Sequence, residues 1–162
     1  MIELVSRKFA MSVKRAYPPA NEEVIAYEVG RQLNLYSIVI LTIVFSLLIG
    51  QLIGSIVAMC TFAFARKITG GLHLKLTLCT IVTVSLFIIA PVIPMSTFSV
   101  VILSVLVSFF YMGLRREQSR WLIVIVSLAN VNILSSEITL VLMAQLLLVW
   151  AAKIKGGENV HE

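Results

Sequence analysis

The chain has 162 residues, of which 59% are hydrophobic and only 13% are charged, and its mean hydropathy is +1.01. A water-soluble fold of this length cannot hide so much apolar surface in one core, so we predict a single membrane-embedded domain over residues 1–162. The net charge of +5 comes from short clusters beside apolar blocks, which does not indicate nucleic-acid binding. The two cysteines give no disulfide framework and no zinc-ligand spacing.

The N-terminal segment is basic and lacks the long apolar core and cleavage site of a signal peptide. After Pro18 and Pro19 comes the stretch ANEEVIAYEVGRQLN, in which Asn21 is placed as a helix N-cap and Glu22 and Glu23 fall in the first turn. The apolar side of this stretch is too short to cross a bilayer. We therefore predict an N-terminal amphipathic helix that lies along the membrane surface.

Three apolar blocks follow this helix. They are Leu33 to Ala65, Leu76 to Leu114, and Trp121 to Ala152. Each block is roughly 32 to 39 residues long, whereas one helix needs about 20 residues to cross the hydrocarbon core. We therefore predict two spans in each block, divided near Gln51 with its flanking glycines, at Pro91 and Pro94, and at Ser135 to Glu137.

All thirteen Lys and Arg residues lie before, between or after the apolar blocks, and the predicted turns inside the blocks contain none. Under the positive-inside rule all four basic segments belong in the cytoplasm, which requires an even number of crossings between neighbouring segments. The prediction is an all-α polytopic membrane protein with about six short transmembrane helices and both termini in the cytoplasm. Because some spans are short, four spans with re-entrant segments is the alternative.

The basic connection RKITGGLHLKLTLC places a histidine and a cysteine close together on the predicted cytoplasmic side. Gly70 and Gly71 end the preceding helix and permit a turn, and His73 and Cys79 follow. An imidazole base, nearby positive charge and a helix N-terminus all favour a thiolate nucleophile. If Thr77 caps the next helix, Cys79 falls in its first turn, where unpaired backbone amides would lower the pKa of the thiol.

The six-residue step between His73 and Cys79 constrains this hypothesis. In a straight helix the two side chains point about 240° apart, and in an extended strand they lie roughly 20 Å apart. A catalytic contact therefore requires a bend between Gly71 and Cys79. The alternative interpretation is a solvated histidine and a cysteine that acts as a small apolar group, which is also how we interpret Cys60 in its apolar run.

The stretch FARKITGGLHLKLTLC resembles the signature of the AgrB-type (accessory gene regulator B) family, membrane cysteine endopeptidases that process quorum-sensing pheromone precursors in bacteria. Arg66, Gly70, Gly71, His73 and Cys79 occupy the places of the family pattern. The stretch NEEVIAYEVGRQLN and the multi-span layout also agree with the family. One feature departs from it, because the histidine and cysteine are six residues apart here and usually seven in the family.

The resemblance implies a cysteine peptidase of the bacterial cytoplasmic membrane that acts on a small amphipathic precursor peptide. Cys79 would be the nucleophile and His73 the general base, with Arg66, Gly70, Gly71 and Lys75 as substrate-binding or supporting residues. We expect no cofactor and no metal, and the bilayer and the precursor as partners; the sequence is compatible with a homo-oligomer. The competing hypothesis is a non-catalytic peptide-binding or transport-assisting protein that retains the peptidase-like scaffold.

Overall fold

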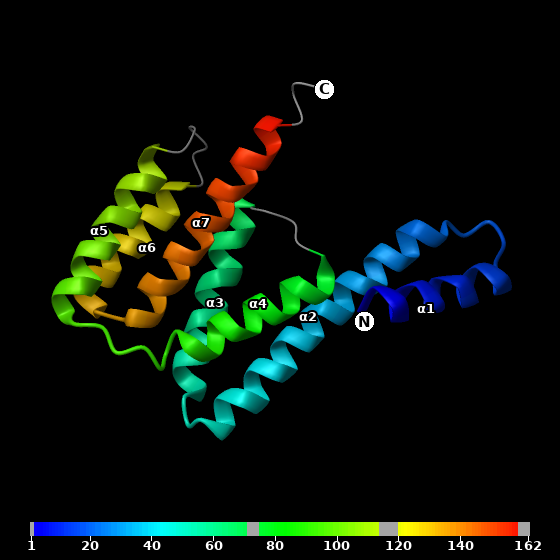
Figure 1. Ribbon diagram of the computed structural model, residues 1–162, viewed down its shortest axis with the longest axis horizontal. Coiled ribbons are helices and arrows are strands. Elements are labelled where there is room, and N and C mark those ends of the chain that lie inside the picture. The colour runs from blue at the N-terminus through cyan, green and yellow to red at the C-terminus, as the bar shows by residue number, and fades with distance from the viewer. Residues whose placement is uncertain (1, 71–74, 114–119, 159–162) are drawn as a thin grey trace.

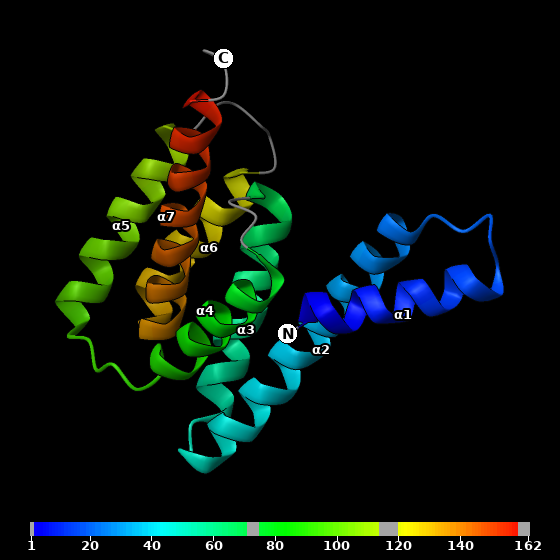
Figure 2. The same cartoon turned by 45° about the vertical axis from the view of Figure 1, so that its right-hand side comes forward.

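The computed structural model describes residues 2–70, 75–113 and 120–158, and its secondary structure in these ranges consists of seven helices. They are α1 (Ile2–Ala16), α2 (Glu22–Leu48), α3 (Leu52–Thr69), α4 (Leu76–Ile89), α5 (Thr97–Gly113), α6 (Arg120–Ile133) and α7 (Ser136–Glu158). The helices α5, α6 and α7 lie side by side, and the hairpin of α1 and α2 projects on the opposite side of α3 and α4 (Figures 1 and 2).

The three predicted breaks inside the apolar blocks are confirmed. Gly50 has a φ of +70° between α2 and α3, a conformation that favours glycine, and Pro91 follows directly after the end of α4. Between α6 and α7, Leu134 adopts a φ of 59° and the side chain of Asn130 accepts a hydrogen bond from the N–H of Ser135 at 3.1 Å. Each apolar block therefore folds as two helices. The helices of the first and third blocks contact each other, whereas in the second block residues 90–96 join α4, which packs on α2, to α5, which packs on α6.

The predicted N-cap at Asn21 is also confirmed, because its side-chain oxygen accepts hydrogen bonds from the N–H groups of Glu23 and Val24. The helix that begins there differs from the predicted short surface helix. It continues without interruption to Leu48, since the sequence of this helix contains no proline and its single glycine, Gly30, is accommodated within the helix. The separate helix in the N-terminal region is α1, which packs on α2 and presents both basic and apolar side chains to its exposed surface.

Three helices in the described part of the chain are long and apolar enough to cross a membrane: α2, α3 and the segment Ser136–Ile154 of α7. The other three apolar helices, α4, α5 and α6, have 14 to 17 residues. These apolar helices and the exposed apolar side chains on them mark a helical membrane protein. The count of six crossings stays a prediction.

The buried core has two adjoining clusters of apolar side chains. One joins α3, α5, α6 and α7 around Tyr111 and Ile123, and the other joins α3, α4 and α7 around Phe62 and Phe87. The second cluster fixes α3 and α4 relative to each other, and α2 completes this half of the molecule through its contacts with α4. The candidate site lies in this half.

Candidate functional site

Cys79 lies in the first turn of α4, as predicted, and its side chain is half-buried. Its sulfur is 3.9 Å from the hydroxyl oxygen of Thr83, one turn further along the same helix. Two adjoining pockets share Cys79 as a lining residue. The other cysteine, Cys60, is exposed on α3 and lines neither pocket.

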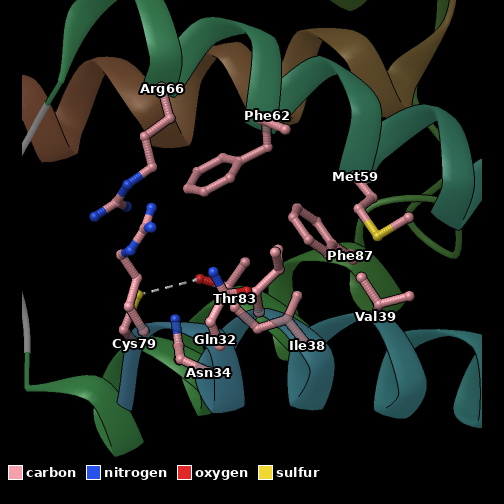
Figure 3. A pocket seen from close by; sticks show the side chains of 13 residues that line it. Gln32, Asn34, Ile38, Val39, Met59, Phe62, Arg66, Cys79, Thr83 and Phe87 are labelled. Carbon is pink, nitrogen blue, oxygen red and sulfur yellow. Dashed lines mark hydrogen bonds between the residues drawn. The ribbon is translucent and has the colours of Figure 1, made fainter. Parts of the chain in front are cut away.

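The first of these, which we call the apolar pocket, has a volume of about 270 Å³ and lies between α2, α3 and α4. Cys79 and Arg66 lie at one end and Met59 and Val39 at the other (Figure 3). Phe62 and Phe87 form one wall, with their ring centres 5.5 Å apart in an edge-to-face arrangement. Most of the other lining side chains come from α2, among them Leu35 and Ile38, and Thr83 of α4 also lines the pocket. A thiol at one end of a mainly apolar cavity can meet a peptide whose apolar side chain fills that cavity.

The second, which we call the outer pocket, has a volume of about 1000 Å³. Its lining includes Glu3 from α1, Tyr27 from α2, Lys75 at the start of α4, and the first residues of α4. Four residues line both pockets: Arg31, Asn34, Arg66 and Cys79. The thiol therefore stands where an apolar cavity opens into a larger and more polar one.

Two arginines from different helices flank this junction. Arg31 on α2 forms an ion pair with Glu28, with 2.9 Å between nitrogen and oxygen. Arg66 at the end of α3 has its guanidinium carbon 5.7 Å from the centre of the Phe62 ring, a cation–π contact. With Lys75, three cationic side chains line the outer pocket against one carboxylate, that of Glu3, and this excess of positive charge attracts acidic groups.

The sequence analysis expected Arg66 and Lys75 to be substrate-binding or supporting residues, and the structure brings both to pockets that Cys79 lines. Arg31 and Asn34 were not predicted. Their spacing of three residues, which places them on one face of a helix, was the available signal. The side-chain oxygen of Asn34 accepts a hydrogen bond of 2.5 Å from the hydroxyl of Thr80, which fixes the amide beside the pocket.

The predicted cap of α4 is wrong in its detail. Lys75, not Thr77, occupies the N-cap position, and its side chain makes no capping hydrogen bond. The N–H of Cys79 donates to the carbonyl of Lys75 at 2.8 Å, so this amide is already paired within the helix. The cap comes instead from Glu3, whose two carboxylate oxygens accept hydrogen bonds from the N–H of Thr77 at 3.1 Å and from its hydroxyl at 2.5 Å.

Glu3 belongs to α1 and was missed in the sequence, because a lone acid in a basic segment gives no sign of a distant partner. The hydrogen bond from the Thr77 hydroxyl is the main reason that the pKa of Glu3 falls from its usual value of 4.5 to about 2. The carboxylate is therefore ionised at neutral pH and complements the positive end of α4.

At the other end of the connection, Gly70 ends α3 as predicted, with a φ of +66° and its N–H bonded to the carbonyl of Arg66. The buried side chain of Gln145 on α7 donates from its amide nitrogen to the carbonyl of Gly70 at 2.6 Å and to the hydroxyl oxygen of Thr69 at 2.9 Å. Gly71 and His73 lie outside the described residues, so the predicted bend between His73 and Cys79 and the roles of the site residues stay predictions. Within the described ranges, no group of three acidic, histidine or cysteine side chains is arranged to hold a metal.

The family model of accessory gene regulator B (AgrB) matches residues 6–139, which is most of the chain and includes the whole connection between α3 and α4. Neither the curated proteins nor the solved structures contain a match. The chain thus belongs to the accessory gene regulator B family, which acts in the agr quorum-sensing system by processing a pheromone precursor.

Proposed function

We propose that the protein is a cysteine endopeptidase that cleaves a small pheromone precursor peptide through a thioester on Cys79. The observation that carries this proposal is the position of Cys79, where an apolar pocket meets a larger pocket lined by cations. A peptidase nucleophile must be reachable by a peptide carbonyl while the neighbouring side chains of the substrate are held, and this position meets both requirements.

In the proposed reaction, His73 removes the thiol proton and the sulfur of Cys79 attacks the carbonyl of the scissile peptide bond. The C–N bond breaks, the amine leaves with the proton from His73, and an acyl-enzyme thioester remains. A thiol or hydroxyl of the peptide itself then displaces Cys79 to give a thiolactone or lactone, or water gives a linear acid. His73 is assigned on the motif and on the chemistry that a thiol requires.

Each pocket has a role in this proposal. The apolar pocket binds an apolar side chain of the precursor next to the scissile bond and excludes water, which favours cyclisation over hydrolysis. The cations around the outer pocket, Arg31, Arg66 and Lys75, attract an acidic part of the precursor. We further propose that this face lies in the cytoplasm, because the basic clusters of the chain flank it.

The decisive experiment compares two cysteine variants. The purified protein is reconstituted in liposomes with a candidate precursor, a short amphipathic peptide with an acidic C-terminal part, and the products are identified by mass spectrometry. Cys79→Ala should lose cleavage entirely, while Cys60→Ala, in which the exposed cysteine outside the pockets is removed, should retain the wild-type rate. A thioester adduct of the N-terminal product on Cys79, released by hydroxylamine, would identify the intermediate. Cleavage by Cys79→Ala would refute the proposal.

A non-catalytic peptide-binding function is the second candidate, and the short step of six residues between His73 and Cys79 favours it. In that case the wild-type protein binds the precursor without cleaving it, and Cys79→Ala binds equally well. Binding measured in the same liposomes by fluorescence anisotropy of a labelled precursor separates the two functions.

A further inference from the structure

The start of α4 depends on a residue far away in the sequence. The N-cap residue Lys75 provides no side-chain hydrogen bond, and the carboxylate of Glu3 accepts from both the N–H and the hydroxyl of Thr77. Cys79 follows two residues later on the same turn. The group that caps the helix carrying the thiol thus belongs to α1, and it lines the outer pocket together with Cys79.

Close packing holds α1 where this cap can form. A Cβ atom built on Gly30 of α2 would lie 2.7 Å from Cδ1 of Leu76 in α4 and 3.3 Å from Oγ of Ser6 in α1. Because Gly30 has no side chain, α1 and α4 both reach the same point on α2. Ser6 is buried there, and its hydroxyl donates to the carbonyl of Glu3 at 3.1 Å, which ties the capping residue to this junction.

We propose that Glu3 is a positioning residue for the thiol: by capping α4 it holds the first turn of that helix, and with it Cys79, in place between the two pockets. The expected change in kcat rests on the proposed peptidase function. The expected change in the position of Cys79 rests on the contacts of Glu3 alone. Glu3 lies before the matched range of residues 6–139, so the family match does not assign it a role.

The same chain offers a matched control. Glu22 is also an acidic residue of the α1–α2 hairpin, and its carboxylate pairs across the hairpin with Lys14 at 3.3 Å. Glu22→Ala removes a contact between α1 and α2 of similar kind, whereas Glu3→Ala removes the contact with α4. An effect that arises only from looser docking of α1 appears in both variants, and an effect on the position of Cys79 appears in Glu3→Ala alone.

The experiment uses the full chain with Cys60→Ala, so that Cys79 is the only thiol, and reports two quantities per folded molecule. The first is the rate at which a water-soluble maleimide alkylates Cys79, and the second is the separate kcat and KM of precursor cleavage. Glu3→Ala should alkylate several-fold faster, because the first turn of α4 frays, and should lose about tenfold in kcat with KM within about twofold. Glu3→Gln, which keeps an acceptor for the N–H of Thr77, should recover most of kcat.

Thr77→Ala tests the same contact by changing the residue that donates to Glu3. This variant also tests the inference if Glu3→Ala does not fold. It should show part of the same effect, and the double variant should be no worse than Glu3→Ala, because the two residues act through one contact. Equal alkylation rates and equal kcat in Glu3→Ala and Glu22→Ala would overturn the inference, and so would strictly additive effects of Glu3 and Thr77. If the wild-type protein cleaves nothing, the peptidase function fails, and the alkylation rates still decide the role of Glu3.

Discussion

The two halves of the molecule use polar side chains differently. In α5, α6 and α7, buried polar groups bond to one another inside the bundle, and these helices line neither pocket that contains Cys79. In α1 to α4, the polar groups near Cys79 line the two pockets, and they include the cations Arg31, Arg66 and Lys75. The difference indicates that the buried polar residues of α5, α6 and α7 serve stability, whereas the polar residues around Cys79 in α1 to α4 line the pockets to which we assign the ligand.

Asn130 is the centre of the buried network. Its amide nitrogen donates to the hydroxyl oxygens of Ser104 and Thr139 and to the carbonyl of Ser135, and its side-chain oxygen accepts from the N–H of Ser135. The residue is fully buried, and its bonds join α5, α6 and α7 at the turn between the last two helices. Asn130 therefore acts as a helix-to-helix contact.

Replacing Asn130 should give the largest effect on stability and should distinguish most clearly between the roles of the two halves. Asn130→Leu removes every bond of the network centre and leaves buried partners unpaired, which should cost about 3 kcal/mol of unfolding free energy. Thermal unfolding in detergent measures this loss. Asn132→Leu, at an exposed position on the same helix, is the control and should change stability by less than about 0.5 kcal/mol.

Precursor cleavage per folded molecule should stay at the wild-type level in Asn130→Leu, because Asn130 lines neither pocket. A variant that unfolds like the wild type and cleaves poorly would contradict the division between a stabilising half and a ligand-binding half.

The contact between the two halves gives the next largest effect. A Cβ atom built on Gly54 of α3 would lie 2.6 Å from Cβ of Pro91, in the turn after α4, and 3.2 Å from Oε1 of Glu137 on α7. The proline cannot move aside easily, so Gly54→Ala should cost about 2 kcal/mol by overpacking. Gly113→Ala is the control, because no other described part of the chain lies within 4 Å of the added Cβ beyond the neighbouring helix backbone, and it should unfold at or above the wild-type temperature. Equal unfolding temperatures for the two variants would show that the turn at Pro91 adapts.

Gln145 connects the halves by hydrogen bonds, from α7 to the end of α3. Gln145→Leu keeps the volume and removes the bonds to Gly70 and Thr69, and should cost about 1 to 2 kcal/mol. It should also lower cleavage per folded molecule, because the end of α3 also carries Arg66, which lines both pockets. The control is Gln51→Leu, an exposed glutamine whose side chain makes no capping bond. A loss of stability with unchanged cleavage would place Gln145 wholly in the stabilising half.

The sequence predicts much of this fold because its strongest signals are local. Gly50, Pro91 and the cap at Asn21 act within one turn of the chain, and each is found where predicted. The grouping of Arg66 and Lys75 with Cys79 follows from their nearness in sequence. Glu3 and Gln145 were not predicted to act at the site because their partners lie 74 to 76 residues away, and no local pattern encodes such contacts.

The smallest effect is the pH dependence of stability that the cap of α4 provides. The folded protein lowers the pKa of Glu3 from 4.5 to about 2, so the unfolded chain takes up a proton at a higher pH than the folded chain does. The stabilisation is therefore complete above about pH 4.5 and is lost as the pH falls towards 2. This stabilisation should be small, because Glu3 is only half-buried and solvent screens its interactions.

The unfolding temperature of Glu3→Gln should fall less than that of the wild type between pH 6 and pH 3. Glu22→Ala should keep the wild-type fall, since the carboxylate of Glu3 remains in place. If Glu3→Gln and wild type lose stability equally over this range, the acid sensitivity of the protein arises at other carboxylates, and the cap contributes to the position of Cys79 without a measurable contribution to folding.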